Sequence, residues 1–130
     1  MIDLIDTNII LRYLVGDDEN LYQKAKQIFE EAKEGKREIH IKVVIIAECC
    51  YVLESFYKKN KHEIADSMEI FLSQKWLKVE DRSSLLSMWH WYRENLHFVD
   101  SYLLACSKQN KSKIITFDKE LNEKLQDYLD

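Results

Sequence analysis

Proline is absent from this sequence, and only two of its 130 residues are glycine. Collagen-like, Pro-rich and Gly-rich architectures are therefore excluded. The P-loop and dinucleotide-binding fingerprints are excluded as well, because each needs several glycines at fixed spacing. The length falls in the range of about 100–200 residues that one domain usually occupies. We expect a single helix-rich domain over residues 1–130.

Cysteine is also scarce. The three cysteines are Cys49, Cys50 and Cys106, an odd number that includes an adjacent pair. This pattern fits neither a disulfide framework nor a CxxC metal site, so we interpret them as small apolar residues in helices. No apolar run approaches the ~18 residues needed to cross a bilayer, and no signal-type segment opens the chain. A cytoplasmic protein without membrane association is expected.

A large excess of positive charge is missing too, because 19 basic and 23 acidic residues give a net charge of −4. This excludes a polycationic nucleic-acid coat. A nucleic-acid enzyme stays open, since local charge rather than the total governs docking. Basic patches at 58–62 and 108–113 could steer a phosphate backbone, although solvated loops are the more ordinary interpretation.

Apolar spacing predicts the order βααβααβααβα. Short strands are expected at 2–5, 38–41, 76–79 and 113–117, the last with the clearest pattern. Helices are expected from Thr7 to near Gly16, up to Gly35, over 43–57, 61–73, 82–93 and 99–109, and after Asp118. Strands separated by helices call for an α/β fold with a short parallel sheet of about four to five strands and helices on both faces.

Four carboxylates stand apart from the solvated acidic residues. Asp6 directly follows the first predicted strand, and Asp118 follows the strand at 113–117. In an open parallel sheet, residues just beyond the carboxyl ends of strands line the ligand crevice. Glu48 and Asp100 each stand alone among apolar residues of a predicted helix. Such a helix face rarely accepts an ionised carboxylate without a partner.

Each of these acids also has a purely structural interpretation. Asp6 and Asp118 could be helix N-caps, and Asp100 could be a first-turn acid that complements the helix dipole. Glu48 could form an ion pair with a distant Arg or Lys. If the fold gathers all four, however, the carboxylates repel one another and would have raised pKa values unless a cation lies among them. Oxygen ligands select Mg²⁺ or Mn²⁺, which favours metal-assisted hydrolysis of a phosphate ester.

The motifs around these acids closely resemble those of PIN-domain ribonucleases of the VapC toxin type. The resemblance covers essentially the whole chain and keeps the family's order. It rests on Asp6-Thr7-Asn8-Ile9-Ile10-Leu11-Arg12-Tyr13-Leu14, Ile46-Ala47-Glu48, Phe98-Val99-Asp100-Ser101-Tyr102-Leu103-Leu104-Ala105 and Ile115-Thr116-Phe117-Asp118-Lys119-Glu120-Leu121.

The resemblance implies a PIN fold whose acidic pocket holds one or two Mg²⁺ or Mn²⁺ ions. Asp6 and Asp100 would be the principal ligands, and Glu48 and Asp118 would complete the pocket. Asn8 and Thr116 resemble the supporting polar positions of the family. The implied reaction is endonucleolytic cleavage of RNA by metal-activated water, leaving a 5′-phosphate and a 3′-hydroxyl.

The resemblance further implies a toxin that forms a homodimer and binds a cognate antitoxin. Many members carry an additional acid just before the third motif, whereas this chain has His97 in that region, which leaves the role of this histidine open. Arg12 is the best-placed candidate for RNA contact. The aromatic cluster at 88–92 puts rings on more than one helix face, so we expect leftover aromatic surface that marks an interface.

Two other classes of function compete with the nuclease. A non-catalytic PIN-like binding module would be expected to have lost some of the acids, and all four are present. A different carboxylate-based phosphate enzyme is the second. A haloacid-dehalogenase-type phosphatase needs an Asp-x-Asp pair, which Asp6-Thr7-Asn8 lacks. A phospho-accepting receiver domain needs a mid-chain nucleophilic Asp, which the central apolar segments do not offer.

Overall fold

A computed structural model describes residues 2–129 of the chain. Three strands are separated by helices, β1 (Ile2–Leu4), β2 (Glu38–Ile41) and β3 (Leu77–Val79). The helices are α1 (Thr7–Val15), α2 (Glu19–Lys33), α3 (Val43–Ser55), α4 (Lys61–Leu72), α5 (Arg82–Ser87), α6 (Trp89–Arg93), α7 (Phe98–Asn110) and α8 (Lys119–Leu129). The predicted α/β order is confirmed as far as β3.

Local sequence signals explain where the early helices begin and end. The side chains of Asp6, Asp18 and Asn60 accept hydrogen bonds from backbone N–H groups in the first turns of α1, α2 and α4. Such caps satisfy donors that the helix itself cannot reach. Gly16 ends α1 with φ +67°, a left-handed conformation that suits glycine. The helix end predicted near Gly16 is therefore confirmed.

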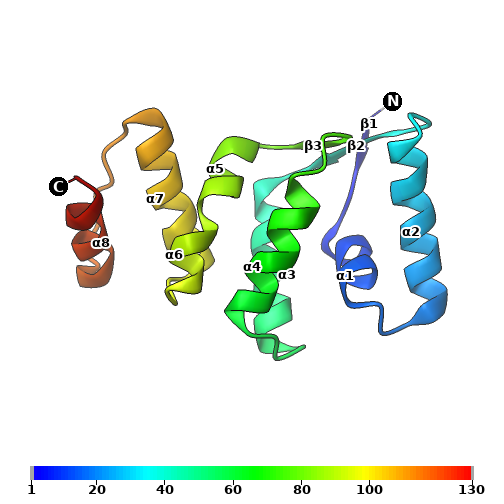
Figure 1. The fold of residues 1–130 in the computed structure, drawn as a ribbon, viewed down its shortest axis with the longest axis horizontal. Helices are drawn as coiled ribbons and strands as arrows, with labels where there is room; N and C mark the ends of the chain where they lie inside the picture. The colour runs from blue at the N-terminus through cyan, green and yellow to red at the C-terminus, as the bar shows by residue number, and fades with distance from the viewer. Residues whose placement is uncertain (1, 130) are drawn as a thin grey trace.

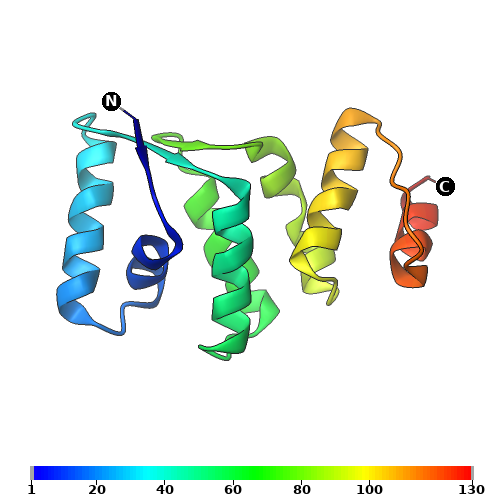
Figure 2. The same cartoon turned by 180° about the vertical axis from the view of Figure 1, so that it is seen from behind.

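The sheet is parallel throughout, in the order β1-β2-β3. One face carries Ile39, Ile41 and Leu77, which are fully buried. The opposite face carries Ile2 and Leu4, which are exposed. In both views the strands lie along the upper rim of the molecule and helices α1–α4 extend below them (Figures 1 and 2). The second face is thus more open than the expected two-sided cover.

The core is continuous from the sheet to the far helices. It joins residues of α1 and α2, such as Ile10 and Phe29, to Trp89 and Tyr92 of α6. Cys49 and Cys50 are fully buried in it, which confirms their interpretation as small apolar core residues. None of the helices within residues 2–129 is both long and apolar enough to cross a membrane.

The prediction of leftover aromatic surface at 88–92 is wrong. Met88, Trp89, Trp91 and Tyr92 are all buried. The physical reason is a break in the predicted helix 82–93, which divides into α5 and α6 at Met88. The change of direction lets aromatic rings that would lie on different faces of one straight helix enter the same core.

The predicted strand at 113–117 is also absent. This segment has no regular secondary structure and pairs with no strand within residues 2–129, so the sheet has three strands rather than four to five. Ile115 is 90% exposed, and Phe117 is fully exposed. The segment follows α7 at one end of the molecule, whereas β1 lies toward the other end (Figure 1). Strand propensity alone cannot form a ladder when no partner edge is adjacent.

Candidate active site

Asp6 occupies the junction between β1 and α1, at the carboxyl end of a sheet strand. Its Oδ1 accepts a hydrogen bond of 3.2 Å from the backbone N–H of Ile9. The capping interpretation of Asp6 is therefore confirmed. Capping uses one carboxylate oxygen and leaves the second available to a ligand.

Glu48 is brought to Asp6 by the packing of α3 against α1. The hydroxyl of Thr7, which is buried, donates a short hydrogen bond to Glu48 Oε1. The partner of this isolated carboxylate is thus a hydroxyl, and no Lys or Arg of residues 2–129 pairs with it. A hydroxyl donor orients the carboxylate without adding a positive charge beside it.

Asp6 and Glu48 line one cavity of about 280 Å³. Its walls are formed by Asp6, Thr7, Asn8, Leu11, Glu48 and Val52. The polar atoms are carboxylate, hydroxyl and amide oxygens, the donor chemistry that Mg²⁺ and Mn²⁺ prefer. The number of charged donors is small, because no group of three or more His, Cys, Asp or Glu within residues 2–129 is placed to hold a metal. The cavity therefore offers two carboxylates with neighbouring hydroxyl and amide groups.

Both carboxylates also act on the neighbouring Cys49. Burial, together with the negative charges of Glu48 and Asp6, raises the pKa of the Cys49 thiol to about 12. The Cys49 Sγ lies 3.9 Å from the backbone oxygen of Thr7. A thiol in this environment stays protonated at neutral pH and cannot act as a nucleophile.

This environment predicts selective thiol labelling. In the native protein we expect an aromatic disulfide reagent to react with Cys106, which is half-buried, and to leave buried Cys49 and Cys50 unmodified. Denaturant should then expose all three thiols. The test is the count of modified thiols before and after unfolding, with Cys106→Ser as the control that should remove the native signal. Rapid native labelling of the Cys106→Ser protein would contradict the burial of α3.

The structure does not place the other two predicted acids in this cavity. Asp100 lies in the first turn of α7, half-buried, as a residue that complements the helix dipole would. Asp118 caps α8, because its Oδ1 accepts a hydrogen bond of 2.9 Å from Leu121 N–H. The Thr116 hydroxyl accepts a bond of 3.0 Å from the N–H of Asp118. Only Asp6 and Glu48 of the four acids line the cavity.

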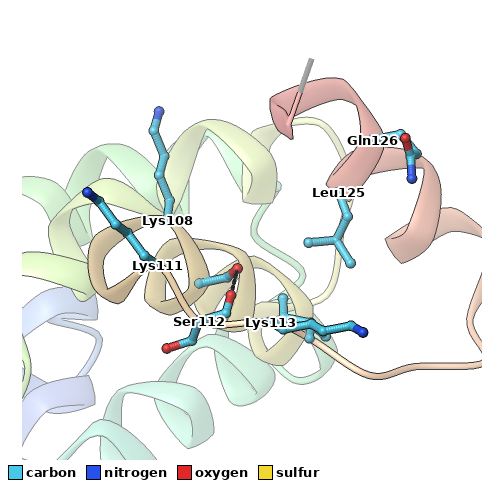
Figure 3. Close-up of a pocket in the computed structure, with 8 residues that line it drawn as sticks. Lys108, Lys111, Ser112, Lys113, Leu125 and Gln126 are labelled. Atoms are coloured by element: carbon cyan, nitrogen blue, oxygen red, sulfur yellow. Dashed lines mark hydrogen bonds between the residues drawn. The ribbon is translucent and has the colours of Figure 1, made fainter.

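The basic residues predicted to contact RNA do not line the cavity of Asp6 and Glu48. Arg12 forms an ion pair of 3.5 Å with Asp17 at the turn between α1 and α2. The lysines around 108–113 surround a second cavity of about 460 Å³ beside α8. In Figure 3 the amines of Lys108 and Lys111 point away from this cavity, while Leu125 points into it. Its lining combines lysine, serine and glutamine side chains with the apolar Ile114 and Leu125.

Thr7 is the residue of this site that the sequence interpretation missed. It stands between Asp6 and Asn8, and its hydroxyl orients Glu48 from a position 41 residues away in the sequence. A polar residue at the start of a helix next to a predicted site acid was the available signal. The long-range contact itself depends on how α1 packs against α3, which one sequence does not reveal.

Comparison with known proteins places this chain in a family. The family model described as PIN domain matches residues 4–124, which is nearly the whole chain. The chain belongs to the PIN-domain family. It is also similar to a VapC ribonuclease of Aquifex aeolicus (strain VF5), with 30% identity over 77 residues. That stretch covers 59% of this chain and 56% of the relative, so the PIN-domain chain spans about half the length of this curated protein. No solved structure matches the chain significantly.

Proposed function

We propose that this PIN-domain protein is a metal-dependent endoribonuclease. The observation that carries the proposal is the pairing of Asp6 and Glu48 in one cavity at the carboxyl end of β1. Two carboxylates that line one cavity and form no ion pair within residues 2–129 favour binding of a cation. The similarity to a VapC ribonuclease supports RNA as the substrate and phosphodiester hydrolysis as the reaction.

In this proposal the ion is Mg²⁺ or Mn²⁺, held by Asp6 and Glu48 with Asp100 and Asp118 as further ligands. One or two such ions would lower the pKa of a bound water and neutralise charge on the phosphate that is attacked. Thr7 keeps the Glu48 carboxylate in a fixed orientation through its hydrogen bond. Asn8 lines the cavity and is placed to donate to a phosphate oxygen or a water. Thr116 and Arg12 are proposed as supporting and RNA-contacting residues.

The proposed biological setting is a toxin–antitoxin pair in which this chain is the toxin. The support is the similarity to a protein named as a VapC ribonuclease. A cognate antitoxin would inhibit the enzyme most directly by covering the cavity of Asp6 and Glu48. A homodimer is part of the same proposal.

The test of the nuclease is cleavage of a mixed structured RNA pool with Mg²⁺ or Mn²⁺ and with chelator. We expect metal-dependent products with 5′-phosphate ends. Asp100→Asn preserves the shape of the side chain and removes its charge, so it should reduce cleavage by at least about tenfold if Asp100 is a ligand. Cleavage that persists in chelator and in the variant would refute the proposal.

A non-catalytic RNA-binding module is the second candidate. It is favoured by one observation, that the cavity holds two of the four acids rather than a full cluster. Binding of the same RNA pool without cleavage, and without a difference between the wild type and Asp100→Asn, would decide for this candidate.

A further inference from the structure

A cavity of about 420 Å³ beside β2 and β3 gathers basic side chains. Lys42, Lys75, Lys78 and Arg82 line it, and Glu80 is the one carboxylate in its lining. Four basic groups and one acid give the cavity a formal net charge of +3, whereas the whole chain, counted in the same way, carries −4. A concave surface of one sign attracts ligands of the opposite charge.

A second basic cavity, of about 480 Å³, continues from the first through Lys78, which lines both. It adds Lys33, Lys36 and Arg37 from the end of α2 and the turn that follows. We call the two cavities together the basic strip. The turn between α2 and β2 lies on the same rim of the molecule as β3 (Figures 1 and 2). The strip joins segments that are distant in the sequence, so it does not show there as a run of basic residues.

Three lysines of the basic strip have no carboxylate partner. Lys33, Lys75 and Lys78 are exposed, and none of them forms an ion pair within residues 2–129. Lys36, Arg37 and Lys42 instead pair with acids at the surface. The positive charge available to a ligand is therefore concentrated around Lys75 and Lys78.

Arg82, the first residue of α5, anchors the turn that carries Lys75. Its guanidinium donates hydrogen bonds to the backbone oxygens of Gln74, at 3.1 Å, and of Leu77. The backbone N–H of Leu77 also donates to the Gln74 oxygen, at 3.1 Å. Carbonyl acceptors have no formal charge, so Arg82 holds the turn and still contributes a positive charge to the cavity.

The basic strip extends toward the cavity of Asp6 and Glu48. Leu4, His40 and Lys78 are paired across the three strands, which places Lys78 two strand spacings, about 10 Å, from β1. At the carboxyl end of β2, Lys42 directly precedes α3. Glu48 follows it by six residues, about 9 Å along a helix. A strand of nucleic acid that lies in the strip is therefore close to both carboxylates.

We propose that the basic strip binds the sugar–phosphate backbone of RNA and leads the strand to the cavity of Asp6 and Glu48. RNA is the occupant because its repeating phosphates complement a line of basic side chains. The two carboxylates of the cavity repel the same strand, so the attraction that holds it must come from a neighbouring surface. The role in catalysis rests on the proposed nuclease, whereas binding of RNA is measured without cleavage.

A purely structural role of the same lysines predicts a different result. β3 is the last strand in the order β1-β2-β3, and Lys78 is its central residue. Lysine on an edge strand discourages pairing with a strand of another chain. If this were its only role, replacing Lys75 and Lys78 would promote aggregation and leave the affinity for RNA unchanged.

The affinity is measured with a fluorescein-labelled single-stranded RNA of about 20 nucleotides, in chelator so that no metal-dependent cleavage occurs. Lys75→Gln/Lys78→Gln should weaken binding by at least about tenfold. Its plot of log affinity against log salt should be shallower by about 1.4, because two phosphate contacts are lost.

Two further variants control for charge and for position. Lys24→Gln/Lys26→Gln removes the same charge from exposed positions of α2 outside the basic strip, so it should bind RNA like the wild type. Lys75→Arg/Lys78→Arg keeps the charge in the strip and should retain the affinity. Equal affinity of the two Gln variants, or a loss in the Arg variant as large as in Lys75→Gln/Lys78→Gln, would overturn the proposal.

Cleavage kinetics separate the basic strip from the nuclease. Lys75→Gln/Lys78→Gln should raise KM for RNA and leave kcat unchanged, because these lysines do not contact the reacting phosphate. Weaker binding with an unchanged KM would refute the path from the strip to the cavity. Weaker binding by this variant, without cleavage by the wild type, would retain the strip and refute the nuclease. Metal-dependent cleavage by the wild type, with equal RNA affinity of the two Gln variants, would refute the strip and retain the nuclease.

Discussion

Asp6→Asn is expected to reduce RNA cleavage by at least about 100-fold, because it removes a negative charge from the proposed metal site. The same change should leave the fold intact. Asn caps helices as well as Asp does, so the bond to the Ile9 N–H can persist and the free energy of unfolding should change by less than about 0.5 kcal/mol. The measurement is the cleavage rate beside a urea unfolding curve.

A matched control exists in the same region of the chain. Asp18 caps α2 as Asp6 caps α1, with a bond of 3.1 Å to Leu21 N–H, but it does not line the cavity. Asp18→Asn should therefore cleave RNA at the wild-type rate. Asp6→Ala removes both the charge and the cap, and should additionally cost about 1 kcal/mol of stability. If Asp6→Asn retained the activity of Asp18→Asn, Asp6 would be a cap and nothing more.

The cap formed by Asp6 shows what local sequence reveals. The cap, the stop at Gly16 and the strand before it all depend on neighbouring residues, and each was predicted from the sequence. The charge of Glu48 was also conspicuous in its apolar setting. Its contact with Thr7 was not predictable, because it joins two helices 41 residues apart. Only packing of the whole chain determines which polar residue meets that carboxylate.

The segment 113–117 is the clearest case of a pattern that local sequence cannot settle. Its composition predicts a strand, yet it has no regular secondary structure and pairs with no strand of residues 2–129. A strand is stabilised by cross-strand neighbours rather than by its own residues. The pattern therefore describes what the segment suits, and the location of a free edge determines where it pairs. The prediction for the aromatic cluster at 88–92 was wrong for a similar reason, because one helix break at Met88 changed which rings could enter the core.

Trp89→Ala is expected to have the largest effect on stability, a loss of about 3–5 kcal/mol. Trp89 is almost completely buried, and it packs edge-to-face on Tyr92 with ring centroids 5.3 Å apart. Its ring also packs against that of Phe98, the first residue of α7, with ring centroids 6.1 Å apart. Truncation leaves a cavity where α6 and α7 meet, so both lose packing together. Urea unfolding followed by circular dichroism measures the loss.

Trp89→Phe separates the packing of Trp89 from its polar atom. The indole Nε1–H is buried without a hydrogen-bond partner within residues 2–129, which is a cost that Phe removes. The smaller ring gives up part of the packing, so the two effects oppose each other and the net loss should stay near 1 kcal/mol. If Trp89→Phe lost as much unfolding free energy as Trp89→Ala, a smaller buried ring would not replace the packing of the indole. Trp89 packs against Phe98, the first residue of α7, and Asp100 lies in the same first turn. An aromatic ring at position 89 should therefore keep Asp100 in place, and Trp89→Phe should retain RNA cleavage.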